Sequence, residues 1–432
     1  MSGYRELSKE ALSTLLESLN EEYKRFVARG LKLNMTRGKP SPEQLDLSRD
    51  MLDVLSSKTE AAVLHERKAD DLRNYGGLTG LPEACALMAA IMGVDPEDTI
   101  VCGNSSLTIM HDLIAHAMTN GIAGQTPWAQ LDEPAEFLCP VPGYDRHFSV
   151  LEHFGIKMIP VSLSSDGPDM NTIERYVNTN PAVKGIWCVP KYSNPTGITY
   201  SHTTVRQFAA LTPAARDFRI YWDYAYAVHT FKEPDDELLN IKTACEEAGN
   251  NNLWYMFSST SKITFAGAGI SAVASSPENI AMIKEYLFYQ TIGPDKLNQL
   301  RHVLFLRDLE GVQAHMRKHA AIIRPKFEMV LRILDEELSD SSIGEWTHPH
   351  GGYFISFSGL PCTAKRIVQL AKDAGLTLTE AGATYPYKKD PYDSNIRIAP
   401  TYPSIDELAS ASTLLALCVK IASVEVLLRT EL

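Results

Sequence analysis

The residues best suited to chemistry lie directly after short apolar runs. Lys262 follows one such run, in the segment 258–262 (SSTSK), and small residues continue through 265–269 (FAGAG). A lysine in such a closely packed segment can form a Schiff base with an aldehyde cofactor. Taken alone, the same letters also favour a solvated lysine in a turn, so other residues must decide between these readings.

A second apolar run ends in a carboxylate, within the segment 221–226 (YWDYAY). Asp223 at the end of a buried strand needs a positive partner, and a pyridinium N–H is one. Tyr226 follows three residues later and could donate a hydrogen bond to a ring oxygen. The alternative is a structural aspartate that caps the next helix.

Three further polar turns follow apolar runs in the same way. In 193–197 (SNPTG), proline and glycine predict a tight turn that leaves the Asn194 amide at the strand ends. The segment 103–107 (GNSSL) precedes a helical pattern, so its backbone N–H groups are available for a phosphate. Tyr144, in 142–147 (PGYDRH), could stack on a ring. Each segment is also compatible with an ordinary turn.

The elements that must position these residues alternate between strand-like and helical patterns from about residue 60 to 310. The apolar strand candidates span 99–102, 136–139, 157–161, 185–189, 219–222 and 253–257. Nearly continuous apolar runs are typical of parallel strands covered on both faces. The pattern predicts an α/β sheet with functional residues in loops at the strand ends.

The two ends of the chain have a different pattern. An apolar stripe predicts a helix over 6–30, and two prolines predict an extended segment at 36–42 (TRGKPSP). After helical stretches over 279–340, a strand is predicted at 351–357 and a last helix from Asp406. We therefore predict a large domain over 61–310 and a smaller α+β domain built from 1–60 and 311–432, with 295–335 as the connection.

The composition excludes several classes of protein. The 432 residues carry 41 Lys and Arg against 53 Asp and Glu, a net charge of −12, which argues against nucleic-acid and anionic-membrane binding. The seven cysteines are scattered without a Cys-x-x-Cys, as in a reducing compartment. The apolar stretch 414–428 contains Lys420 and Glu425 and predicts a packed amphipathic helix. A cytoplasmic protein is predicted.

In their order and context these motifs resemble fold-type-I pyridoxal-phosphate enzymes, specifically class I aminotransferases. The resemblance extends from 38–40 (GKP) through 75–82 (YGGLTGLP) to 395–400 (NIRIAP). Within that class the chain resembles a divergent branch associated with aspartate aminotransferase, formerly labelled MocR-like or alanine–glyoxylate aminotransferase-like. The resemblance implies pyridoxal 5'-phosphate, a mainly parallel seven-stranded sheet with a smaller α+β domain, and a homodimer with shared active sites.

The resemblance also assigns roles around the cofactor ring. It makes Lys262 the Schiff-base lysine and Asp223 the partner of the pyridine nitrogen. Asn194 and Tyr226 correspond to ligands of the phenolic oxygen, and Tyr144 to the stacking aromatic residue. His147 corresponds to a histidine that supports the aspartate, although a surface histidine would fit its sequence context equally well.

Other positions correspond to the phosphate cup and the substrate site. The phosphate-cup positions are Asn104, Ser105, Ser106 and Ser259, joined by Tyr75 from the neighbouring subunit. Arg397 corresponds to the arginine that grips the substrate α-carboxylate, with Asn194 and the backbone of Gly38 nearby, and its planar fork suits a bidentate bond. A cation for a second carboxylate is expected from Arg37, Lys39, Arg146 or Lys296.

One departure from the family pattern matters. The family places an arginine shortly after the lysine to neutralise the phosphate, whereas this chain has 267–271 (GAGIS) there. A partly buried phosphate still needs a positive charge. We predict that Lys296, in 291–296 (TIGPDK), supplies this charge, with a location across the dimer interface as one option and a surface lysine as the alternative.

The expected reaction moves an amino group between an L-amino acid, aspartate first, and 2-oxoglutarate by a ping-pong mechanism. Alanine, aromatic amino acids or kynurenine remain open as substrates, and so does a pyridoxal-phosphate lyase. A non-catalytic ligand-sensing module is disfavoured, because such regulators add a basic DNA-binding domain. His315 and His319 share one helical face without accompanying carboxylates or cysteines, so a solvated face is predicted rather than a metal site.

Overall fold

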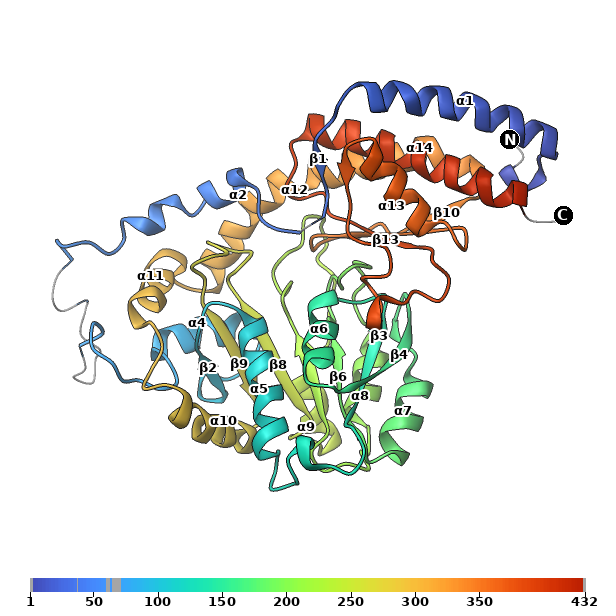
Figure 1. Cartoon of the computed structure of the whole chain (residues 1–432). Helices are drawn as coiled ribbons and strands as arrows, with labels where there is room; N and C mark the ends of the chain where they lie inside the picture. The colour runs from blue at the N-terminus through green and yellow to red at the C-terminus, as the bar shows by residue number, and fades with distance from the viewer. Residues whose placement is uncertain (1–2, 37, 60–62, 64–70, 430–432) are drawn as a thin grey trace.

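The computed structural model describes residues 3–36, 38–59, 63 and 71–429, which form two adjoining bodies (Figure 1). The larger body is built around a sheet. The smaller body contains segments from both ends of the chain, drawn in blue and red, which lie side by side. Arg37 lies outside the described residues.

The large sheet has the strand order β2-β9-β8-β7-β6-β3-β4-β5. Its strands are β2 (Thr99–Val101), β3 (Glu136–Val141), β4 (Lys157–Ser164), β5 (Gly167–Pro168), β6 (Val183–Cys188), β7 (Arg219–Asp223), β8 (Trp254–Ser259) and β9 (Ser271–Ser275). The central strands β4, β3, β6, β7 and β8 pair in parallel, whereas β9 pairs antiparallel with β8 and β2. The mainly parallel α/β prediction is confirmed, with eight strands in place of seven because the two-residue β5 extends the edge.

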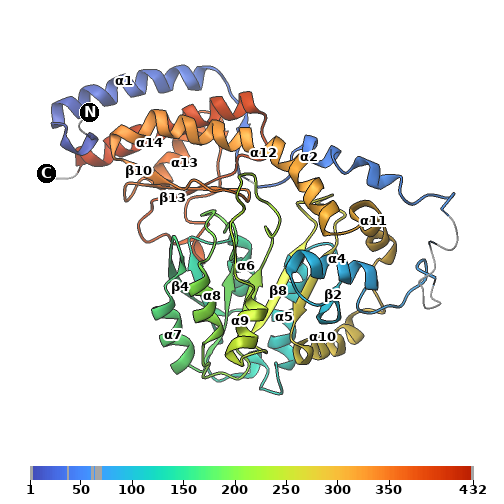
Figure 2. The ribbon, with the colours of Figure 1, turned by 180° about the vertical axis from the view of Figure 1, so that it is seen from behind.

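Helices cover both faces of this sheet, as Figures 1 and 2 show from opposite sides. One face carries α5 (Ser106–Asn120), α6 (Asp145–His153) and α10 (Pro277–Gln290); the other carries α4 (Pro82–Met92), α7 (Met170–Thr179), α8 (His202–Ala209), α9 (Ile241–Ala248) and α11 (Lys296–Leu306). Successive strand residues point to opposite faces. In β7, Tyr221 therefore packs under α5, α6 and α10 on one face, and Trp222 packs under α4, α8 and α9 on the other.

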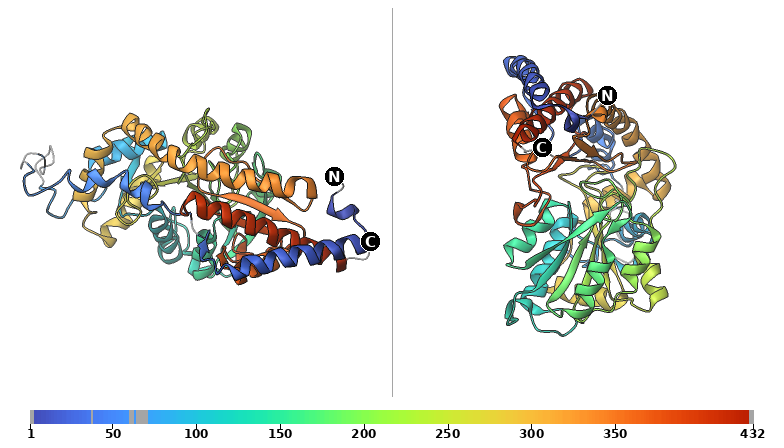
Figure 3. Two further views of the ribbon diagram at one scale, coloured as in Figure 1. Left: turned by 90° about the horizontal axis from the view of Figure 1, so that it is seen from above. Right: turned by 90° about the vertical axis from the view of Figure 1, so that its right-hand side faces the viewer.

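The smaller body contains residues from both ends of the chain (Figure 3). Its helices are α1 (Lys9–Ala28), α12 (Leu309–Leu338), α13 (Ala364–Asp373) and α14 (Ile405–Arg429). Its strands are β1 (Leu33–Asn34), β10 (Gly344–Trp346), β11 (Ile355–Gly359), β12 (Leu376–Thr377) and β13 (Asn395–Ile398). The sheet β10-β11-β13 is antiparallel, and β1 pairs with β12 in parallel.

Helix α14 packs against α1, α12 and α13 and is buried on nearly every side. The predicted packed helix is present, but it is not amphipathic, because neighbouring helices cover most of its circumference. Among the described residues it alone has the length and hydropathy (1.9) of a membrane span, and 67% of that stretch is buried as in a core helix.

The connection between the two bodies is α12, which runs from α11 into the small body (Figure 1). The short helix α2 (Pro42–Asp46) packs on α12, and the turn at Arg49–Leu52 packs on α11. The segment after residue 41 therefore leaves the core formed by α1 and α14. The domain boundaries near residues 60 and 310 stay a prediction.

Candidate active site

A cavity of about 820 Å³ lies at the carboxyl ends of β3, β6, β7 and β8, where the small body faces the sheet. Parallel strands bring the loops at this edge together. The cavity is lined by twelve of the predicted site residues: Gly38, Lys39, Ser105, Ser106, Tyr144, Arg146, Asn194, Asp223, Tyr226, Ser259, Lys262 and Arg397. Residues separated by more than 300 positions in the sequence thus share one site.

Lys262 follows β8 and is half-buried, with its amine beside two phenol rings. Its amine lies 5.0 Å from the ring centre of Tyr226 and 5.9 Å from that of Tyr353. Burial lowers the pKa of the Lys262 amine, and the nearby charge of Asp223 opposes this shift. A lowered pKa increases the fraction of neutral amine, which is the nucleophilic and proton-accepting form.

Asp223 ends β7 and is buried with one oxygen paired and one unpaired. Its Oδ2 lies 3.0 Å from Nε2 of His147, whose ring stacks on Trp187 at 4.4 Å. The other oxygen, Oδ1, has no hydrogen-bond partner among the described residues. A buried, unpaired carboxylate oxygen is costly unless a donor occupies the adjoining space. The site therefore fits a ligand that carries a positive N–H, and His147 is a buried support of Asp223, not a surface residue.

Three aromatic and amide groups surround the space between Lys262 and Asp223. Tyr144 is the residue before α6, and burial raises the pKa of its phenol to about 12. Burial also raises the pKa of the Tyr226 phenol. Both phenols therefore stay protonated at neutral pH and can donate hydrogen bonds. Asn194 lies in the turn after β6, with its side-chain oxygen facing the guanidinium of Arg397 at 3.4 Å.

Arg397 projects from β13 of the small body into the cavity. Its Nη1 donates to Oδ1 of Asp145 at 2.6 Å, and its Cζ lies 5.0 Å from the ring centre of Phe354. Its Nε has no partner among the described residues. The guanidinium therefore keeps a donor free for a carboxylate. A Cβ at Gly38 would lie 2.4 Å from the Phe354 ring, which explains the glycine there.

The sequence profile of the aspartate amino-transferase family matches residues 7–431. The chain belongs to the aspartate aminotransferase family. The aspartate aminotransferase of Corynebacterium glutamicum is 43% identical over 422 residues, which cover 98% of this chain and 96% of the relative. The crystal structure of an aspartate transaminase from the same organism is 42% identical, covers 98% of this chain and 99% of that chain, and gives a TM-score of 0.95.

A more distant structure shares the fold alone. The α-aminoadipate aminotransferase of Thermus thermophilus is 19% identical, with coverage of 93% and 95% and a TM-score of 0.73. The predictions of an aminotransferase and of the fold-type-I class are confirmed by these relationships.

In this aminotransferase the predicted phosphate cup lies at the N-terminus of α5. Ser105 and Ser106 line the cavity there, opposite Ser259. The sequence interpretation missed Ser261, whose hydroxyl accepts from Ser259 at 3.1 Å and donates to the backbone oxygen of Asn104 at 3.2 Å. The backbone oxygen of Asn104 thus anchors Ser261, and Asn104 itself is not part of the cavity lining.

Two further predicted residues of the aminotransferase lie outside the cavity of their own chain. The Tyr75 side chain is exposed, with 77% of its surface accessible. Lys296 is buried, and its amine donates to the backbone oxygens of Asn74 at 2.9 Å and Gly76 at 2.7 Å. Within one chain Lys296 therefore does not reach the predicted phosphate cup. It holds the turn that carries Tyr75, so the interpretation as a free surface lysine is wrong.

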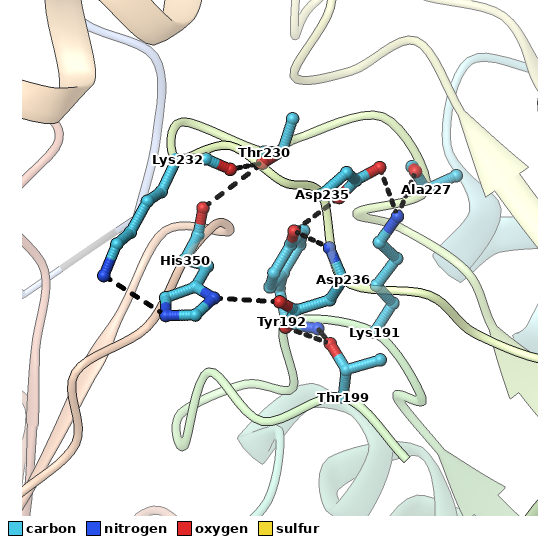
Figure 4. A network of polar contacts seen from close by, with 9 residues as sticks. All are labelled: Lys191, Tyr192, Thr199, Ala227, Thr230, Lys232, Asp235, Asp236 and His350. Atoms are coloured by element: carbon cyan, nitrogen blue, oxygen red, sulfur yellow. Dashed lines mark hydrogen bonds and ion pairs between the residues drawn. The ribbon is translucent and has the colours of Figure 1, made fainter. Parts of the chain in front are cut away.

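A polar network, drawn in Figure 4, secures the turn of Asn194. Asp235 accepts from Lys191 at 2.8 Å and from the Tyr192 hydroxyl at 2.5 Å. Asp236 accepts from Thr199 at 2.9 Å and lies 2.9 Å from Nδ1 of His350.

These contacts join the Asn194 turn, the segment after Tyr226, and the turn that precedes Tyr353 in the small body. The sequence carried no signal for the network, because its members come from three distant segments.

Proposed function

We propose that the protein binds pyridoxal 5'-phosphate and transfers the amino group of L-aspartate to 2-oxoglutarate. The observation that carries this proposal is the half-buried Lys262 amine in one cavity with the unpaired oxygen of Asp223 and the free donor of Arg397. The names of the Corynebacterium glutamicum relatives support aspartate as the substrate. A cytoplasmic location belongs to the same proposal and is supported by seven free cysteines.

Pyridoxal phosphate supplies an electron sink for the pair of electrons left when the substrate Cα–H bond breaks. Lys262 would hold its aldehyde carbon, Asp223 its ring nitrogen, and Tyr144 one ring face. Asn194 and Tyr226 would donate to its ring oxygen. Its phosphate would accept from the backbone N–H groups at the start of α5 and from the hydroxyl groups of Ser105, Ser106 and Ser259.

The chain's own groups then orient the substrate and move one proton. Arg397 binds the α-carboxylate in place of Asp145 and fixes the direction of the Cα–H bond. The substrate amine would displace Lys262 from the aldehyde carbon, and the freed neutral amine of Lys262 would then accept the Cα proton. Lys39 and Arg146 line the same cavity and are the described cations available to a second carboxylate.

The experiment that tests this function is a half-reaction panel. The purified holoenzyme is mixed with aspartate, glutamate, alanine or an aromatic amino acid, and the loss of the cofactor absorbance is followed together with the oxoacid formed. Aspartate and glutamate are expected to react fastest. Faster reaction with alanine or aromatic amino acids would reassign the substrate, ammonia release would indicate a lyase, and absence of oxoacid would indicate a sensor.

Arg397→Lys is expected to lower kcat/KM for every amino acid and oxoacid. Lysine keeps the charge but loses the planar fork, and breaking such a buried charge-assisted contact costs about 2–5 kcal/mol. This corresponds to a loss of about 30-fold to 5,000-fold in kcat/KM. Steady-state kinetics measure the change, and Arg332→Lys, at an exposed position on α12, serves as the control. Retained kcat/KM in Arg397→Lys would remove Arg397 from the carboxylate site.

The homodimer forms a further part of the proposal. Large apolar side chains are exposed at the end of α10 and in the loop that follows it, including Phe288 (72%), Tyr289 (80%) and Ile292 (65%). Gly293 packs directly against the backbone of Gly76, so exposed Tyr75 belongs to the same surface. Burial of such a patch favours association with a second copy. Tyr75 would then reach the partner's phosphate cup.

Lys296→Met is expected to weaken cofactor retention by loosening the turn that carries Tyr75. Two hydrogen bonds from a buried ammonium group are lost, and each such bond contributes about 1.5–3 kcal/mol. Equilibrium dialysis of pyridoxal phosphate and size-exclusion chromatography measure the effect. Lys9→Met, at an exposed position on α1, is the control. Unchanged cofactor affinity in Lys296→Met would show that the turn held by Lys296 does not contribute to cofactor binding.

A further inference from the structure

Two histidines on α12 lie against the backbone next to Lys262. Nε2 of His315 and Nε2 of His319 each lie 2.9 Å from the carbonyl oxygen of Ile263. Their residues are 5% and 0% exposed. The prediction of a solvated histidine face is therefore wrong, because this face of α12 packs on the Lys262 loop and on α2.

The hydrogen-bond partners assign the tautomer of His319. Its Nε2 lies next to a carbonyl oxygen, which only accepts, so this nitrogen carries the hydrogen. Nε2 of His315 also lies 3.2 Å from Nε2 of His319 and 3.1 Å from the Ser48 hydroxyl, so it has a donor as well as an acceptor beside it. Nδ1 of His319 is then an acceptor, and the Gln44 amide donates to it at 3.1 Å. The second N–H of that amide donates to the hydroxyl of Tyr353 at 2.9 Å, and its oxygen accepts from the Ser41 backbone at 3.1 Å. The Gln44 side chain thus uses both N–H donors and its oxygen.

The pair stays neutral under ordinary conditions. Burial lowers the pKa of His319 to about 4 and also lowers that of His315. Protonation of His319 would place a hydrogen on Nδ1, toward which the Gln44 amide already directs its own hydrogen. Both the charge and the orientation of the His319 ring are therefore fixed by its surroundings.

The chain of contacts meets the active site at both ends. At one end, Ile263 directly follows Lys262. At the other end, the ring of Tyr353 lies 5.9 Å from the Lys262 amine. We propose that His319, supported by His315 and Gln44, is a positioning residue that holds the Lys262 backbone and the Tyr353 phenol in one geometry. The inference rests on the proposed pyridoxal-phosphate function. It adds that His319 sets the position of Lys262 within that site.

The two nitrogens of His319 can be tested separately, because side-chain amides reproduce them one at a time. In His319→Gln the amide nitrogen reaches the place of Nε2 and can still donate to Ile263. In His319→Asn the amide reaches only the place of Nδ1, so the bond to Ile263 is lost. His319→Leu removes both contacts, and His116→Leu, which removes a half-buried histidine beside Tyr286, is the control.

The readout is covalent capture of pyridoxal phosphate by the cofactor-free protein. The Lys262 amine condenses with the aldehyde and releases water, and borohydride then supplies hydride that reduces the C=N bond to a stable amine. Peptide mass spectrometry gives the rate of labelling at Lys262. His319→Asn and His319→Leu are expected to label at least tenfold more slowly than the wild type, with kcat reduced and KM little changed. His319→Gln and His116→Leu are expected to remain within about threefold of the wild-type rate.

Equal labelling in all His319 variants would overturn the proposal, and so would a His319→Gln rate as low as that of His319→Asn. If the His319 variants do not fold, His315→Gln and His315→Leu give the same comparison at the second nitrogen contact. Failure of the wild type to label at Lys262 would instead overturn the proposed function. The two failures are therefore distinguishable.

Discussion

Lys262→Ala is expected to abolish transamination, with a loss of about 10⁴-fold or more in kcat. The amine is the group in the cavity that both anchors the aldehyde carbon and accepts the Cα proton, and removal of general-base catalysis alone costs about 10² to 10⁴. Its lowered pKa supports this role, since a lower pKa raises the fraction of neutral amine. Single-turnover mixing of the cofactor-loaded variant with aspartate measures the remaining rate.

Cofactor binding separates the chemical loss from a folding defect. Asp223, Tyr144 and the start of α5 do not depend on the Lys262 side chain, so the variant should still retain pyridoxal phosphate without a covalent bond. Lys157→Ala, at an exposed position on β4, serves as the control and should keep full activity. More than a few per cent of wild-type turnover in Lys262→Ala would contradict the assignment of the base.

Most of the site could be predicted because the residues that follow parallel strands lie together at the carboxyl edge of the sheet. Lys262, Asp223 and Asn194 each follow an apolar run, and the sheet order places those runs side by side as β8, β7 and β6. The pattern of apolar runs therefore carries information about distance as well as about secondary structure. Arg397 needed the family resemblance, because nothing local shows that β13 faces the large sheet.

The parts that could not be predicted depend on contacts between distant segments. Asp145 meets Arg397 across 252 positions in the sequence, and Gln44 meets His319 across 275. His315 and His319 look solvated in a sequence, because charged neighbours surround them and the face that packs on α2 is set by tertiary structure. Strand β9 was missed for a related reason: its small residues Ser271–Ser275 lack the bulky apolar pattern, yet all are buried.

Asp223→Asn is expected to lower kcat by about 10² to 10³, the size of effect seen when one group that stabilises developing charge is removed. The amide matches the carboxylate in shape and can still accept from His147, but it carries no charge. Without this negative charge the protonated form of the pyridine nitrogen is no longer stabilised, so the cofactor ring would accept electrons less readily. Half-reaction rates with aspartate measure the loss, and the cofactor should remain bound.

The same strand offers a matched control for this substitution. Asp217, which precedes β7 at the opposite end of the sheet, is also buried, and it accepts from Lys184 and from Trp128, each at 2.8 Å. Asp217→Asn leaves a buried ammonium without its charged partner, which costs about 3–5 kcal/mol of stability. We therefore expect Asp217→Asn to lower the melting temperature while the folded protein keeps its kcat. Asp223→Asn is expected to lower kcat while the melting temperature stays close to that of the wild type. A large loss of kcat in both variants would mean that the charge of Asp223 acts through folding and not through the cofactor ring.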